Sequence, residues 1–125
     1  MKAEDFQRKF KIRCSFESMT LSEAVRIVIE QNKSLGCIPT RFMTMTQMGN
    51  AVDLREVIIH LVMKRELLET LENAIERYGN LVAIEDLIAY KNDGFNLPEE
   101  VVGEARARSQ WFDQLRQGHK IKITH

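Results

Sequence analysis

The chain has 125 residues, of which 44% are hydrophobic and 29% charged, and its basic and acidic side chains are equal in number. This balance is typical of a globular domain and excludes a disordered chain, which needs low hydrophobicity and high net charge. There is no apolar run long enough to cross a membrane, and the first residues lack the apolar segment of a signal peptide. We therefore expect one domain, residues 1–125, working in the cytoplasm.

The first element, residues 6–16, fits two structures. From residue 10 onward apolar and polar side chains alternate, which slightly favours a half-buried strand. Phe6, Phe10 and Cys14, however, are spaced four apart, as on one face of a helix. Residues 120–124 also alternate, so the strand alternative predicts a small two-stranded edge formed by the two chain ends.

Two helices are expected next. Thr20 and Glu23 form a capping-box pattern ahead of apolar residues at helical spacing, which predicts a helix over residues 21–34. Gly36 is suited to end it. Pro39 then favours the start of a short helix, whose phenylalanine and methionines either pack in the core or form an adaptable contact surface.

The longest predicted helix covers residues 51–78, with Asn50 as its cap and Gly79 at its end. A row of residues at alternating spacings of three and four runs along it, which is the pattern of a seam between two chains. The apolar face is wider in the first half, which favours a central helix inside a globular body. The candidate oligomer seam consists of Leu54, Val57, Leu61, Lys64, Leu68, Leu71, Ile75 and Tyr78.

The remaining pattern predicts a short helix over residues 82–92, capped by Asn80, and a last helix from Asn96 to about Gln117, stopped by Gly118. The expected fold is therefore mainly α, with four to five helices around the long central helix at about 51–78. A small two-stranded edge from the chain ends would complete it.

No motif of a catalytic site, cofactor site or metal site is found. His60 is followed four residues later by Lys64, which excludes a helical zinc pair at this point. The neighbouring acids Glu85 and Asp86 are interpreted as first-turn or surface charges, as are Glu99 and Glu100. The sequence therefore predicts a protein that is not an enzyme and that binds neither a cofactor nor a metal.

The charges are unevenly distributed along the chain. Residues 80–104 carry six acidic and one basic side chain, whereas residues 105–125 carry five basic and one acidic, and residues 1–13 carry five basic and two acidic. Either these regions neutralise one another in the fold, or the basic ends form a docking face for nucleic acid. The candidate nucleic-acid contacts are Lys9, Lys11, Arg13, Arg106, Arg108, Arg116, Lys120 and Lys122.

Three stretches share a wider pattern: GCIPTRFMTM at 36–45, LVAIEDLI at 81–88 and EARAR at 104–108. Together they resemble a set of small uncharacterised bacterial helical proteins. These carry a Gly-aromatic-x-Pro-x-x-Phe-x-x-Met stretch, a Leu-rich helix with an internal Glu and a closing Ala-Arg-x-Arg helix. The resemblance covers about residues 24–116 and departs at Cys37, where an aromatic residue is expected. It implies a common helical fold and no particular activity.

Two classes of function follow from the sequence. The first is a small non-enzymatic helical protein that acts as a protein–protein interaction subunit or regulator, with another protein or a second copy of itself as partner. The alternative is a nucleic-acid-binding accessory protein that uses its basic N- and C-terminal segments. Neither class involves a membrane partner.

Overall fold

The computed structural model describes residues 2–46, 53–65 and 67–124, and in these residues it contains helices and no strand. The predicted mainly α class is confirmed, although the described residues form more helices than the four to five predicted. The elements are α1 (Lys2–Phe10), α2 (Leu21–Ser34), α3 (Thr40–Thr46), α4 (Leu54–Met63), α5 (Leu68–Tyr78), α6 (Ile84–Tyr90), the 3₁₀ helix η1 (Gly94–Asn96) and α7 (Glu99–Thr124).

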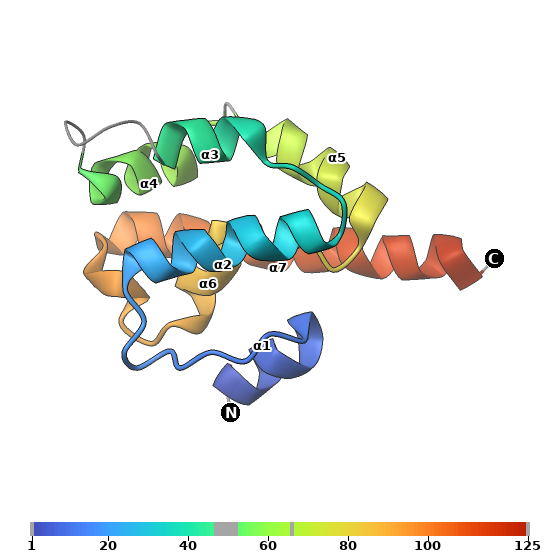
Figure 1. Ribbon diagram of the computed structural model, residues 1–125, viewed down its shortest axis with the longest axis horizontal. Coiled ribbons are helices and arrows are strands. Elements are labelled where there is room, and N and C mark those ends of the chain that lie inside the picture. Colours follow the sequence, from blue (N-terminus) through green and yellow to red (C-terminus); the bar gives the residue numbers. More distant parts are fainter. Residues whose placement is uncertain (1, 47–52, 66, 125) are drawn as a thin grey trace.

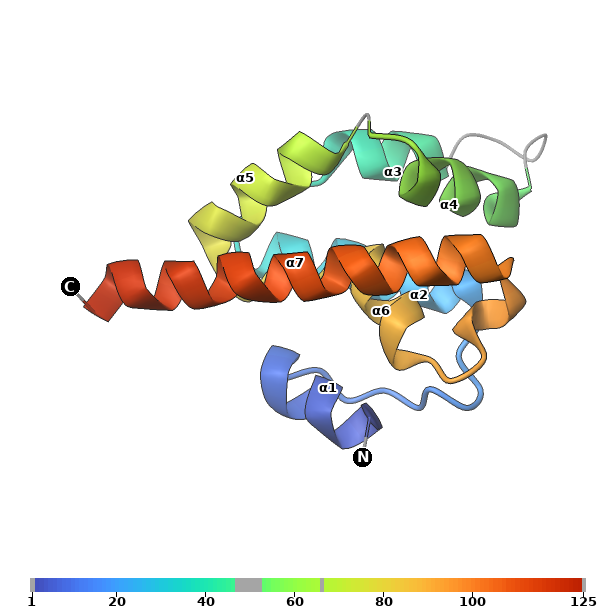
Figure 2. The same ribbon diagram turned by 180° about the vertical axis from the view of Figure 1, so that it is seen from behind.

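The helix at the centre of the fold is α7. It packs against α4, α5 and α6, and α6 in turn contacts α1 and α2. Helices α3, α4 and α5 lie on one side of α2 and α7, and α1 lies on the opposite side (Figures 1 and 2). The predicted central helix at 51–78 is therefore wrong in both its continuity and its central position.

The chain breaks the predicted helix between α4 and α5. Lys64 leaves helical geometry with φ −102° and ψ 156°. Arg108 of α7 donates from Nη1 to the carbonyl of Leu61 (3.2 Å) and from Nη2 to the carbonyl of Lys64 (3.0 Å). These bonds satisfy carbonyl groups that a further helical turn would otherwise use. The predicted cap Asn50 lies outside the described residues, and the side chain of Asp53 caps α4.

The N-terminal segment is helical only as far as Phe10, and residues 11–16 form neither a helix nor a strand. Phe6 and Phe10 of α1 are both buried, so up to Phe10 the helical spacing of four residues predicts the buried face correctly. The ring of Phe6 lies 5.1 Å from that of Phe16 and 5.4 Å from that of Tyr90, measured between centroids. The helix ends before Lys11, whose φ is 60°. An aromatic cluster thus attaches α1 to α6.

At the other chain end, α7 continues past its predicted stop. Residues 120–124 belong to this helix, so they do not form the predicted two-stranded edge with the N-terminal segment. A glycine ends a helix well when it adopts positive φ, as Gly36 (89°) and Gly79 (75°) do after α2 and α5. Gly118 stays within α7 and is not among the glycines with positive φ.

The predicted start and end of α2 and the start of α3 are confirmed, together with the half of the capping box that Thr20 forms. The hydroxyl of Thr20 accepts a hydrogen bond of 3.1 Å from the backbone N–H of Glu23, as the capping pattern predicts. Helix α3 begins directly after Pro39. Its aromatic and methionine side chains are partly buried against the core, namely Phe42, Met43 and Met45.

Gly94 occupies a position that requires glycine. Its φ is +58°, and a Cβ atom there would lie 2.5 Å from Cγ2 of Val102. We predict that Gly94→Ala lowers the free energy of unfolding by about 2–4 kcal/mol, because backbone strain and steric overlap add. Gly103 provides the control, since a Cβ there meets nothing within 4 Å. Gly103→Ala should stabilise the protein by about 0.5–1 kcal/mol in urea denaturation. If Gly94→Ala and Gly103→Ala lowered the free energy of unfolding by the same amount, this account of Gly94 would be contradicted.

Candidate functional site

Helix α6 begins with two carboxyl groups inside the protein. Glu85 and Asp86 lie in its first turn, as the sequence predicts, but they are 1% and 0% exposed, so they are not surface charges. All residues from Leu81 to Ile88 are buried. Buried charges are costly unless they are paired and hydrogen-bonded, so the partners of these two residues determine what the region can do.

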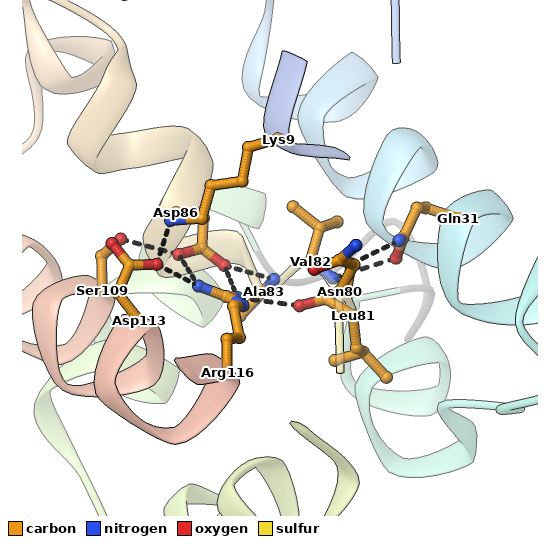
Figure 3. Close-up of polar contacts among 10 residues, drawn as sticks. All are labelled: Lys9, Gln31, Asn80, Leu81, Val82, Ala83, Asp86, Ser109, Asp113 and Arg116. Atoms are coloured by element: carbon orange, nitrogen blue, oxygen red, sulfur yellow. Dashed lines mark hydrogen bonds and ion pairs between the residues drawn. The ribbon is translucent and has the colours of Figure 1, made fainter. Parts of the chain in front are cut away.

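Asp86 is fully engaged in a cluster between α6 and α7 (Figure 3). Its Oδ2 accepts from Nη2 of Arg116 (2.6 Å) and from the backbone N–H of Ala83 (2.8 Å), and its Oδ1 accepts from the hydroxyl of Ser109 (2.6 Å). Arg116 also donates to Asp113 (2.8 Å). Burial by itself lowers the pKa of Arg116, but the two neighbouring carboxylates outweigh it and raise the pKa. We interpret this cluster as structural.

The same cluster fixes the segment that precedes α6. Arg116 donates from Nη2 to the carbonyl of Leu81 (2.8 Å). From the other side, Gln31 of α2 donates to the carbonyl of Asn80 (2.8 Å) and accepts from the N–H of Val82 (2.9 Å), as Figure 3 shows. Asn80 belongs to this segment and does not cap α6 as predicted; instead, the side chain of Asp86 accepts a hydrogen bond from the N–H of Ala83 at the N-cap position.

Glu85 is only half satisfied. Its Oε2 accepts from Nη1 of Arg108 (3.2 Å), and the same guanidinium donates from Nε to Glu104 (3.2 Å). The other oxygen, Oε1, has no hydrogen-bond partner within the described part of the chain. Burial raises the pKa of Glu85, and the backbone N–H of Glu85 and the nearby Arg108 oppose this effect only in part. An unsatisfied buried acceptor costs about 1–3 kcal/mol, so it calls for an explanation.

An apolar cavity of about 290 Å³ lies next to Glu85. Its walls come from α2, from the segment leading into α3, and from α4, α5 and α6. Glu85 and Asn32 are buried polar residues in these walls. The cavity reaches the surface at Ile38, a wall residue that is 68% exposed. Most of the remaining lining is apolar, including Val28, Phe42, Leu61, Leu71, Ala74 and Leu81.

The candidate oligomer seam is used largely inside the chain's own fold. Leu61 and Ile75 are buried, and Leu61 and Leu71 line the cavity. Lys64 is exposed at the break between α4 and α5. The remaining seam residues are partly buried against the core and belong to two separate helices, namely Leu54, Val57, Leu68 and Tyr78.

The candidate nucleic-acid contacts do not form one surface. Arg108 and Arg116 are buried in ion pairs with Glu85 and Asp86, and Lys9 forms an ion pair with Asp113. Both arginine pairs join residues 105–125 to residues 80–104, as the alternative of neutralisation within the fold predicts, although the sequence did not identify the individual partners. Lys11, Arg13 and Arg106 are exposed, whereas the side chains of Lys120 and Lys122 lie outside the described part of the structure.

Metal ligands, membrane-spanning helices and free thiols are other features that can indicate a function. Within the described residues, no group of three or more His, Cys, Asp or Glu side chains is placed to hold a metal ion. Over the same residues, none of the helices has the length and apolar character needed to cross a membrane. Cys14 and Cys37 are free thiols, and burial raises the pKa of both. The apolar cavity beside Glu85 is therefore the strongest candidate site.

The raised pKa of Glu85 predicts a pH dependence of stability. Between the ordinary carboxyl pKa of the unfolded chain and the raised pKa of the folded protein, the folded protein binds more protons. The stabilisation contributed by Glu85 therefore decreases as the pH rises through this window. In urea denaturation, the stability of the wild type relative to Glu85→Gln should decline over the same window. Glu104→Gln is the control, and a pH-independent difference for Glu85→Gln would contradict the raised pKa.

Comparisons with protein-family models, with curated proteins and with solved structures find no match to this chain. The resemblance to small bacterial helical proteins therefore stays a prediction. The candidate site rests on the geometry of the cavity and of Glu85.

Proposed function

We propose that this chain is a non-enzymatic interaction protein, a small subunit or regulator, that holds one apolar side chain of a partner protein in the cavity beside α3. The observation that supports it best is a cavity of about 290 Å³ with largely apolar walls, which reaches the surface at the exposed Ile38. Protein interfaces gain most of their binding energy from a few large side chains that fill such pockets.

The size and the rim of the cavity favour a protein over a small molecule or cofactor. Its volume of about 290 Å³ lies just below the range of about 300–1,000 Å³ that is usual for ligand pockets, and it suits a single large side chain. Ile38 and Arg41 are exposed wall residues. A molecule enclosed in the cavity would leave much of their surface uncovered, whereas a protein segment would extend across it.

The other two partners have weaker support. A homodimer through the candidate seam would need side chains that the fold already uses, such as Leu61 and Ile75. Nucleic-acid binding would have to proceed without Arg108 and Arg116, whose charges are paired inside the protein. Phosphate contacts need accessible cations, so the remaining basic residues offer a smaller surface than the sequence suggests.

The proposal is tested with peptides selected from a displayed random library on the immobilised protein. Ala74→Leu adds bulk to a partly buried wall residue, and Ala107→Leu makes the same change at an exposed position of α7. We expect Ala74→Leu to weaken the selected peptides by about ten-fold or more and Ala107→Leu to leave their affinity unchanged. Ile38→Asp at the exposed rim provides a second variant in case Ala74→Leu does not fold.

Two outcomes of the peptide selection would contradict the proposed function. The proposal is wrong if no peptide is selected, or if the selected peptides bind Ala74→Leu and Ile38→Asp as tightly as the wild type. Light scattering on a sizing column adds a separate check. A wild-type dimer that Ala74→Leu converts to a monomer would identify a second copy as the occupant and would overturn the proposal of a different partner.

A further inference from the structure

Glu85 is a buried carboxyl residue in the wall of a largely apolar cavity. The residue is 1% exposed and lines the cavity. One of its oxygens accepts from Arg108, while Oε1 has no partner among the described residues. Buried polar groups in folded proteins are nearly always hydrogen-bonded. A side chain bound in the cavity can supply the missing donor.

The walls limit what that side chain can be. Val28, Leu71 and Ala74 require a large apolar body, and Oε1 of Glu85 requires a donor at one end of it. Leucine and phenylalanine have no side-chain donor. Lysine and arginine have donors, but they would bring a second positive charge close to Arg108, which already pairs with Glu85. Tyrosine and tryptophan combine a large apolar ring with a single neutral O–H or N–H group.

We infer that the partner segment presents a tyrosine-like or tryptophan-like aromatic side chain, whose O–H or N–H group donates a hydrogen bond to Oε1 of Glu85. This inference rests on the proposed function and adds the chemistry of the anchor. The ring fills the apolar part of the cavity, and the polar group satisfies the buried carboxyl. Specificity arises because an anchor without the donor leaves Glu85 unsatisfied.

The test compares two small probes of the same bicyclic shape. Indole carries an N–H group, and 1-benzothiophene has a sulfur atom in its place. Titration calorimetry and NMR on the full chain should show that the wild type binds indole about ten-fold or more tightly than benzothiophene, although benzothiophene is the more hydrophobic of the two. Ala74→Leu should weaken both probes, and Ala107→Leu should weaken neither.

Glu85→Leu should remove the preference for indole, whereas Glu104→Gln, which alters the other partner of Arg108, should keep it. If Glu85→Leu does not fold, the ratio of the two probes on the wild type still decides the question. Equal binding of both probes, or tighter binding of benzothiophene, overturns the inference. Binding of neither probe overturns it as well. The peptide selection tests the proposed function separately. Selected peptides that insert a leucine or a phenylalanine into the cavity would support the proposed function and would contradict the inference of a tyrosine-like or tryptophan-like anchor.

Discussion

Replacing Arg116 with alanine is expected to lower the free energy of unfolding by about 3–5 kcal/mol, because Asp86 would keep a buried charge without its cation. Asp86 is 0% exposed and accepts a 2.6 Å hydrogen bond from this guanidinium. The substitution also removes the donor to the carbonyl of Leu81. Urea denaturation followed by circular dichroism measures the loss.

Arg106 provides the matched control for Arg116. It lies on the same helix and is exposed, so Arg106→Ala should change the stability by less than about 0.5 kcal/mol. A double variant, Arg116→Ala with Asp86→Asn, removes the unpaired charge and should recover part of the loss. A similar small effect of Arg116→Ala and Arg106→Ala would mean that the ion pair does not hold α6 against α7.

Replacing Phe6 with alanine is the second large effect we expect, at about 3–5 kcal/mol. Phe6 is fully buried, and its ring lies 4.9 Å from that of Phe10 and 5.4 Å from that of Tyr90, between centroids. The substitution removes the centre of the aromatic cluster that attaches α1 to α6. Chemical denaturation gives the loss of stability, and amide hydrogen exchange shows whether α1 alone becomes less protected.

Phe95 provides the comparison for Phe6, because it is an aromatic residue that is only partly buried. Phe95→Ala should therefore cost clearly less than Phe6→Ala. Two results together would contradict the packing of α1 against α6. The two variants would lose the same stability, and the amides of residues 2–10 would exchange as fast in the wild type as in Phe6→Ala.

Predictions that rest on neighbouring residues were the most successful. The cap formed by Thr20 and Glu23 and the helix start after Pro39 need no information from elsewhere in the chain, and both are confirmed. The stop at Gly118 was also a local prediction, and it is wrong. Glycine permits a left-handed end to a helix but does not impose one, so the sequence could not decide between the two outcomes.

Predictions that depend on distant residues were less successful. The apolar row at 51–78 is interrupted only at Lys64 in the sequence, and the helix ends there because Arg108 binds the carbonyl groups at the end of α4. The N-terminal alternation slightly favoured a strand, and the helix of residues 2–10 is explained only by the packing of Phe16 and Tyr90 on Phe6. In both cases the deciding contact comes from another element.

The candidate site was also only partly predictable from the sequence, because it depends on contacts between distant residues. The sequence placed Leu61 and Leu71 on one apolar row, and both do line the cavity. It gave no indication that Glu85 would be buried with one oxygen unpaired, because that depends on how α6 sits between α2 and α7. The apolar residues on both sides of Glu85 in the sequence were the one indication that this acid is buried. They are not sufficient, because a buried acid is expected only where an arginine partner is also identified.

A crystal structure of the protein with a library-selected peptide is the most direct test of the proposed function. We predict that one side chain of the peptide enters the cavity between Ile38 and Ala74, with the rest of the peptide lying across α3. A peptide bound on another face, with the cavity unchanged, would contradict the account.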